Sequence, residues 1–287
     1  MKVTRAALPF LPSCERLLPG RFAGLSVALL KATALEFAIL AGHLLLYPSG
    51  IAQERRAPVP VPPVDGAAQL PTRAKPPVVL LHGFIDNRSV FVLLRRSLAQ
   101  HGRQQIESVN YSPLTCDIRA AAEQFGRHIE EVCERTGSRR VDVVGHSLGG
   151  LIARYYVQRL GGDARVRTLV TLGTPHAGTR VMPVANAHPI VRQMRPGSPV
   201  LEELTLPAPD CRTRFVGFWS DLDHVMDPVE TARIDHPDLM AQNVHVTGIG
   251  HLALPVHPAV ANGIREVLDT AQPGEPSAEH TGGLTVA

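Results

Sequence analysis

Residues 141–156 read VDVVGHSLGGLIARYY and place a serine, Ser147, between a β-prone run and an amphipathic run. The β-prone run covers residues 141–144 and predicts a buried strand, whereas the residues after the serine have a helical period. Gly145 and Gly149 stand two positions before and two positions after Ser147, where a tight strand-to-helix turn leaves no room for a Cβ atom. The stretch therefore predicts a sharp turn that holds the Ser147 hydroxyl above a β-sheet, close to the positive N-terminal end of a helix.

The chain from residue 78 onward repeats this alternation of short apolar runs and helical periods. Such alternation is typical of an α/β domain with a mostly parallel sheet. The expected strands are residues 78–81, 105–111, 141–144, 166–172, 213–219 and 243–249. The expected helices are residues 89–101, 117–136, 148–160 and 258–270. The prediction is a sheet of about six strands flanked by helices.

The composition divides the chain into four parts. Residues 1–56 contain an apolar run at 24–47, which predicts a helix. Residues 57–77 carry seven prolines and predict an extended, semi-rigid linker. Residues 78–271 form the expected α/β domain, and residues 272–287 are a small, polar tail that we expect to be disordered.

The apolar run at 24–47 is long enough to cross a bilayer, but Lys31, Glu36 and His43 interrupt it. Three interpretations stay open. The run is an uncleaved membrane anchor, a signal peptide cleaved near residues 50–52, or a helix docked on the protein itself. The anchor and the signal peptide predict a membrane-associated or extracytoplasmic protein, and the docked helix leaves a cytoplasmic location open.

A serine is a poor nucleophile without a general base, and among the 13 histidines His251 is the best placed. It follows the last expected strand in a loop, from which it can reach back over the sheet to Ser147. We expect eight other histidines of the domain to shape the pocket or to lie at the surface and cap helices. The first group is His82, His146 and His176, and the second is His101, His128, His188, His236 and His257.

An orienting acid is expected in the turn after the strand at 213–219, because the usual chain order of such sites is serine, acid, histidine. This turn offers Asp221, Asp223 and Asp227. Asp223 is preferred because an apolar pair and a proline follow it and would bury its far side. Asp221 is the second choice, and we expect Asp227 to cap the next helix.

A tetrahedral intermediate needs backbone N–H groups directed at its oxyanion. The segment LLHGF follows the first expected strand, so its Phe84 N–H and the Leu148 N–H after the serine form the expected pair. Gly83 would let the backbone turn inward at this point. We therefore place Gly83, together with the neighbouring His82, among the residues expected to contact substrate.

These motifs together resemble an α/β-hydrolase of the bacterial lipase and esterase group. The resemblance spans residues 78–270, with spacing most similar to minimal triacylglycerol lipases. It implies Ser147 as the nucleophile, His251 as general base and acid, and Asp223 as the orienting acid, with an acyl-enzyme intermediate. The motifs that carry it are His82 to Phe84, Gly145 to Gly150, Gly173 to Gly178, Asp223 to Pro228 and Gly250-His251. The segment GTPH at 173–176 is also similar to larger lipases and deacylases that act on lipid-anchored substrates.

Two parts of the chain depart from the minimal enzymes: the N-terminal apolar run and an insertion at 179–211. The apolar residues of the insertion are broken by prolines and by Gly197, as in short helices that lie over a cleft. A mobile lid and a fixed cap that completes the core both fit this pattern.

Other partners and cofactors find little support in the sequence. The net charge is +3, and the arginine pairs are scattered without interleaved aromatic residues, so we expect no nucleic acid partner. No Cys/His spacing predicts zinc, no acidic loop predicts calcium, and the expected chemistry needs no cofactor. Cys116 and Cys133 flank one expected helix and lie roughly 25 Å apart along it, too far for a disulfide.

The expected function is hydrolysis of lipid carboxylic esters with an apolar acyl chain. An acyltransferase, or a deacylase of lipid-linked substrates, would use the same residues. A hydrolase-like domain that binds lipid or a partner without turnover is the alternative from another class. It gives no reason to keep Ser147, Asp223 and His251 in order.

Overall fold

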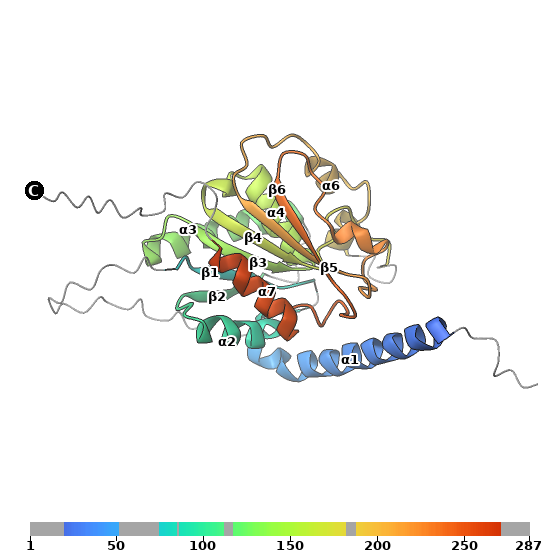
Figure 1. Ribbon diagram of the computed structural model, residues 1–287. Coiled ribbons are helices and arrows are strands. Elements are labelled where there is room, and N and C mark those ends of the chain that lie inside the picture. Colours follow the sequence, from blue (N-terminus) through green and yellow to red (C-terminus); the bar gives the residue numbers. More distant parts are fainter. Residues whose placement is uncertain (1–19, 52–74, 85, 112–116, 182–187, 271–287) are drawn as a thin grey trace, which may run out of the picture.

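The computed structural model describes residues 20–51, 75–84, 86–111, 117–181 and 188–270. Six parallel strands form one sheet in the order β2-β1-β3-β4-β5-β6 (Figure 1). The strands are β1 Val78–Leu81, β2 Ile106–Val109, β3 Val141–His146, β4 Val166–Leu172, β5 Arg214–Ser220 and β6 Met240–Val246. The expected linker residues 57–74 and the expected tail 272–287 lie outside the described residues.

Helices cover both faces of this sheet. The main helices are α2 Val92–Gln100, α3 Ile118–Thr136, α4 Leu148–Arg159 and α7 Pro258–Asp269. Shorter ones are α5 Pro189–Gln193, α6 Pro199–Glu203 and the 3-10 helices η2 Arg88–Phe91, η3 Gly162–Ala164 and η5 Val229–Ala232. Along β1, Val79 and Leu81 join the core under α3 and α4, whereas Val78 and Leu80 join the core under α2 and α7. A strand buried on both faces has a continuous apolar sequence, so the predicted α/β architecture is confirmed.

Element boundaries agree with the prediction within about two residues except at β6. This strand was expected at 243–249 but runs from Met240 to Val246 as a largely exposed edge strand paired with β5. An exposed edge strand lacks the apolar run by which a strand is recognised. The expected helix 89–101 divides into η2 and α2. Asp227 does not cap a helix as predicted, because Pro228 holds the N-cap position of η5 without a side-chain cap.

Helix α1, Gly20–Ile51, lies along the side of the molecule that carries α2 (Figure 1). Its C-terminal end is fastened to the domain by side chains that donate to its carbonyl oxygens. Asn110 Nδ2 donates to Gly50 O at 2.7 Å, and Asn87 Nδ2 donates to Tyr47 O at 2.9 Å. The structure therefore shows α1 in the docked arrangement.

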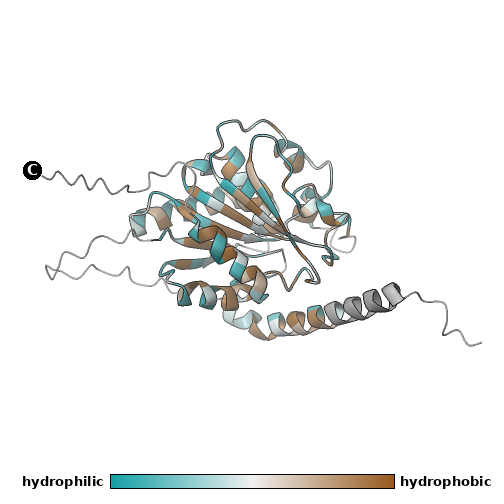
Figure 2. Ribbon diagram, in the orientation of Figure 1, coloured by the Kyte–Doolittle hydropathy of each residue, from teal (hydrophilic) through white to brown (hydrophobic). Residues whose placement is uncertain are grey.

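Apolar residues occur along the described part of α1 (Figure 2), and many of their side chains are exposed. Segment Thr33–Ile51 is the one stretch of the described chain long and apolar enough to cross a membrane. Phe37 is 68% exposed and Leu45 is 82% exposed. Leu35, Leu44, Leu46 and Ile51 are also exposed. We call these six side chains the outer face of α1.

The described part of the insertion at 179–211 packs as part of the core. Its two short helices, α5 and α6, begin at prolines, as predicted for a segment broken by proline. Their buried side chains join the core that lies under α3 and α4, and include Ile190, Val191, Met194, Val200, Leu201 and Leu204. The described residues of the insertion therefore contribute to the core of the domain. Residues 182–187, with Met182 and Val184, lie outside the described residues.

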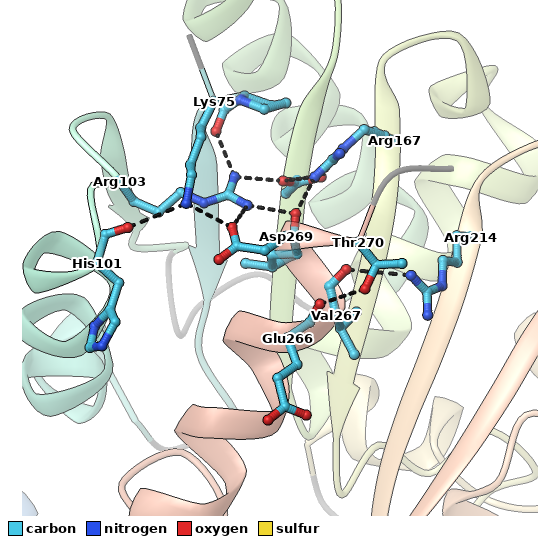
Figure 3. A network of polar contacts seen from close by, with 12 residues as sticks. Lys75, His101, Arg103, Arg167, Arg214, Glu266, Val267, Asp269 and Thr270 are labelled. Atoms are coloured by element: carbon cyan, nitrogen blue, oxygen red, sulfur yellow. Dashed lines mark hydrogen bonds and ion pairs between the residues drawn. The ribbon is translucent and has the colours of Figure 1, made fainter. Parts of the chain in front are cut away.

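A buried ion network joins the start of β3 to the end of α7. The fully buried Asp142 accepts from Arg103 NH1 at 3.0 Å and from Arg167 Nε at 2.8 Å. Both guanidinium groups also donate to Leu268 O at the end of α7. Figure 3 shows Arg103 and Arg167 converging on this corner, where Arg103 also meets Asp269. The network lies at the amino-terminal ends of the strands, opposite the carboxyl ends that carry Ser147.

Candidate active site

Ser147 lies between the end of β3 and the start of α4. It has φ 52° and ψ −123° and is the one non-glycine residue with positive φ in the described ranges. Such a backbone costs about 1–3 kcal/mol and persists only where neighbours enforce it. Here Ser147 N donates to Leu172 O at 2.9 Å, and Thr174 Oγ1 donates to Ser147 O at 3.0 Å. The support of this turn by Thr174 was not predicted from the sequence.

The glycines beside Ser147 are sterically required. A Cβ at Gly145 would lie 2.6 Å from the Cα of Gly150. A Cβ at Gly149 would lie 2.3 Å from the carbonyl oxygen of Leu81 in β1. Backbone atoms cannot yield as a side chain can, so the turn requires glycine at both positions, as predicted.

His251 and Asp223 form a buried hydrogen-bonded pair. Nδ1 of His251 donates to Oδ2 of Asp223 at 2.8 Å, and Asp223 is fully buried. The other oxygen of Asp223 accepts from the N–H of Val225 at 3.0 Å and of Met226 at 3.3 Å. Asp221, the second choice from the sequence, is exposed and accepts instead from Gly248 N.

The imidazole of His251 is more basic than that of an ordinary histidine. Burial by itself lowers the pKa of His251, but the charge and the hydrogen bond of Asp223 raise it, and the net pKa lies above the ordinary value. The Asp223 contact also fixes the proton on Nδ1 in the neutral ring, which leaves Nε2 as the basic nitrogen.

His146 contacts the loop that carries His251. Its Nε2 donates to the main-chain oxygen of His251 at 3.1 Å, and the two ring centroids are 4.8 Å apart. Because His146 precedes Ser147 directly, this bond links the loop of His251 to the residue before the predicted nucleophile. Ser147, Asp223 and His251 follow the carboxyl ends of β3, β5 and β6 in turn.

The segment from His82 to Phe84 lies against the serine. A Cβ at Gly83 would be 3.3 Å from Cβ of Ser147. The His82 ring stacks on Tyr111 with centroids 4.4 Å apart, and its Nδ1 donates to Gly83 O at 2.8 Å. Burial lowers the pKa of His82 to about 4, so the ring is neutral at pH 7. These contacts fix the backbone that carries the predicted oxyanion donor Phe84 N–H, while Leu148 opens α4 on the other side.

His176 is held in the core by both ring nitrogens. Nε2 donates to Thr171 Oγ1 at 2.9 Å, and Nδ1 accepts from Arg154 NH1 at 3.2 Å. Burial keeps the pKa of His176 well below its ordinary value, so this assignment of one donor and one acceptor fits a neutral ring. No ring nitrogen is left for the substrate contact that the sequence predicted.

A second polar cluster, missed from the sequence, adjoins the site. Asp86 Oδ2 lies 3.5 Å from His146 Nδ1, and Asp86 Oδ1 lies 3.7 Å from His43 Nδ1 on α1. Burial raises the pKa of Asp86, but the contacts with His146 and His43 lower it below its ordinary value. The carboxylate is therefore ionised at neutral pH. No grouping of three or more His, Cys, Asp or Glu in the described ranges is arranged to hold a metal ion.

Comparison with protein families decides the classification. A model described as palmitoyl protein thioesterase matches residues 77–232, more than half of the chain. The chain belongs to the palmitoyl protein thioesterase family. The matched range contains Ser147 and Asp223, and it begins one residue before β1.

Curated relatives of this thioesterase-family chain include two bacterial triacylglycerol lipases. The Burkholderia plantarii enzyme is 29% identical over 140 residues, covering 42% of this chain and 38% of the relative. The Pseudarthrobacter phenanthrenivorans enzyme is 30% identical over 111 residues, covering 36% of this chain and 34% of the relative. The chain thus spans little more than a third of the length of these relatives.

Solved structures show the same fold at low sequence identity. The mature Bacillus licheniformis lipase BlEst2 matches with a TM-score of 0.58 and 16% identity, covering 76% of this chain and 96% of that one. Aspergillus fumigatus lipase B matches with a TM-score of 0.61 and 15% identity, covering 72% of this chain and 55% of that one. The predicted resemblance to α/β-hydrolases of the lipase and esterase group is confirmed.

Proposed function

We propose that the protein hydrolyses carboxylic esters of lipids through Ser147, His251 and Asp223. The observation that carries this proposal is the 2.8 Å bond between His251 Nδ1 and Asp223, in a loop tied to the residue before Ser147. With Nδ1–H directed at Asp223, Nε2 of His251 is free to accept the proton of Ser147 Oγ. The deprotonated oxygen attacks the ester carbonyl carbon, and the carbonyl oxygen becomes an oxyanion.

The remaining steps use the same groups. The N–H groups of Phe84 and Leu148 stabilise the oxyanion. As the intermediate collapses, the bond to the alcohol oxygen breaks, and His251 returns its proton to that oxygen. Water then loses a proton to His251 and attacks the acyl carbon. The bond from this carbon to Ser147 Oγ breaks, His251 returns the proton to Oγ, and the fatty acid is released.

A second substrate class follows from the family match. The matching family model is described as palmitoyl protein thioesterase, so a long-chain acyl thioester is the alternative substrate. The same residues serve for a thioester, since only the leaving atom changes from oxygen to sulfur. The two classes are distinguished by comparing p-nitrophenyl palmitate with an S-palmitoyl thioester at equal acyl length.

We also propose that α1 rests on a lipid surface without crossing it. Its outer face is apolar and exposed, whereas Glu36 accepts hydrogen bonds from the loop of His251 and the C-terminal end of the helix is fastened to the domain. A transmembrane orientation would break these contacts and place a carboxylate in the hydrocarbon. We expect the protein to float with vesicles and to be released by an alkaline carbonate wash. Retention after that wash would contradict a peripheral location.

The catalytic proposal is tested with Ser147→Ala. The variant should stay folded and lose both ester hydrolysis and labelling by a fluorophosphonate probe. Ser138→Ala, in the turn before β3 at the opposite end of the sheet, is the control and should keep both. Turnover by Ser147→Ala above about a hundredth of the wild-type rate would reject Ser147 as the nucleophile, since loss of a triad member costs far more in known triads.

A further inference from the structure

Helix α1 reaches the loop that carries His251 through one carboxylate. Glu36 Oε2 accepts from the N–H of Leu252, and Glu36 Oε1 accepts from the N–H of Ala253, both at 3.0 Å. These are the two residues directly after His251. The bonds join positions more than 200 residues apart in the sequence. One side chain therefore fixes two consecutive peptide groups next to the proposed base.

Gly250, the residue before His251, provides the space for this contact. A Cβ at position 250 would lie 2.4 Å from Cδ of Glu36 and 2.5 Å from Oε1. A carboxylate bound to two N–H groups cannot share that space with a methyl group. The absence of a side chain at Gly250 thus leaves the space that the Glu36 carboxylate occupies.

A second connection joins α1 to the same loop. His43 lies seven residues after Glu36, two turns along the helix, and so occupies the same face. It is buried beside Asp86, which in turn faces His146. His146 donates to the oxygen of His251. Helix α1 therefore contacts the loop of His251 directly through Glu36. It is also linked to that loop through His43, by way of Asp86 and His146.

We infer that Glu36 is a positioning residue for His251, and that α1 is a component of the active site as well as a surface helix. This inference rests on the proposed function, in which His251 is the general base. Two charge-assisted hydrogen bonds hold the loop in the position where His251 meets Asp223. The carboxylate also brings a negative charge close to the imidazole.

The charged and titratable groups around His251 come from four elements. They are Asp223 after β5, Asp86 before η2, His146 at the end of β3, and Glu36 and His43 on α1. Burial lowers the pKa of His251, and the three carboxylates, Asp223 first, raise it. Removal of the Glu36 charge is therefore expected to lower that pKa.

The decisive variant is Glu36→Gln in the full-length protein. We expect kcat to fall roughly tenfold with little change in KM, because about one hydrogen bond to the loop is lost. We also expect the acidic limb of the kcat/KM profile to move to lower pH. Glu266→Gln removes an exposed carboxylate on α7 and is the charge-matched control, with no shift of the limb. An unshifted limb in Glu36→Gln would overturn the inference.

Two further variants separate charge from hydrogen bonding and from folding. Glu36→Asp keeps the charge on a shorter side chain, so kcat should fall while the acidic limb stays closer to that of the wild type. Gly250→Ala should lower kcat in the wild-type background by displacing the carboxylate. In a Glu36→Ala background the same glycine substitution should add little further loss. Fully additive losses would contradict a direct contact between these two positions.

Failure of the inference is distinguishable from failure of the proposed function. If Ser147→Ala is inactive but the profile of Glu36→Gln matches that of the wild type, the triad stands and the role of α1 is rejected. If Ser147→Ala remains active, the proposed function itself is rejected.

Discussion

The ring of His146 donates a hydrogen bond from Nε2 to the main-chain oxygen of His251, 3.1 Å away. Both residues are buried. Because this bond ends on the backbone of the base, it leaves the imidazole of His251 free to bind Asp223 through Nδ1. The residue directly before Ser147 thus holds the main chain of His251.

We expect His146→Ala to lower kcat roughly tenfold with little effect on KM, because a buried hydrogen bond contributes about 1–1.5 kcal/mol. His146→Gln should restore part of the rate, since its amide N–H can donate toward the same oxygen. His236→Ala is the matched control, because its Nε2 donates to Leu206 O at the same 3.1 Å but away from the site. Steady-state kinetics on a p-nitrophenyl ester measure all three variants. Equal losses in His146→Ala and His236→Ala would point to general destabilisation.

The acid is tested by replacing Asp223 and Asp221 in turn. Asp223→Asn should lower the acylation rate by roughly 10³ to 10⁴, because the amide no longer holds the proton on Nδ1 of His251. Asp221→Asn should be mild, since Asp221 is exposed and accepts from Ser220 Oγ and Gly248 N, not from His251. Pre-steady-state acylation measures both variants. The reverse order of effects would reassign the acid.

The pH dependence follows from the raised pKa of His251. Only the neutral imidazole accepts the serine proton, so kcat/KM should rise with pH, with a midpoint above the ordinary histidine value of about 6.5. The same shift affects stability. A histidine whose pKa is higher in the folded state stabilises the fold fully below about pH 6.5, and this contribution is lost as pH rises through the folded pKa. A His251→Gln variant should lose this part of the stability profile, as measured by denaturation at several pH values.

The local motifs of the site were readable from the sequence, because their chemistry depends on short spacing. The turn at Ser147 needs two glycines within five residues, and the acid is limited to a short turn after β5. No short sequence motif predicts where α1 docks on the domain. Glu36 binds backbone N–H groups of residues distant in the sequence, and any residue except proline offers an N–H.

The misplaced boundary of β6 has a related physical cause. Its outer side chains face solvent, so no apolar run marks Met240 to Gln242 as strand. The strand is defined by its pairing with β5, where Arg214 stands opposite Met240. As a result Gly248 and Gly250 lie in the loop before His251, which is the loop that Glu36 contacts.

Steric demand at the serine turn predicts the effect of Gly149→Ala. The added methyl group would lie 2.3 Å from the Leu81 carbonyl oxygen. To relieve this clash, α4 would have to move away from β1 or the backbone at Ser147 would have to change. We expect loss of probe labelling together with a lower melting temperature. Gly42→Ala is the control, because nothing lies within 4 Å of its Cβ position on α1 and its φ is negative. Normal labelling of Gly149→Ala would show that the turn relaxes more easily than this packing implies.

The ion network around Asp142 lies at the end of the sheet away from Ser147. It therefore gives a prediction about the stability of the fold and not about catalysis. Asp142→Ala removes the carboxylate that the buried guanidinium groups of Arg103 and Arg167 share, which should lower the free energy of unfolding by about 3–5 kcal/mol. Glu130→Ala removes the exposed partner of Arg165 and should cost less than about 1 kcal/mol. Because Asp142 is the second residue of β3 whereas Ser147 follows its end, the folded fraction of Asp142→Ala should keep wild-type kcat. Denaturant unfolding measures the free energies, and fluorophosphonate active-site titration gives the folded fraction. A loss below about 1 kcal/mol would mean that water or local rearrangement satisfies both arginines, and that the network does not hold α7 to the sheet.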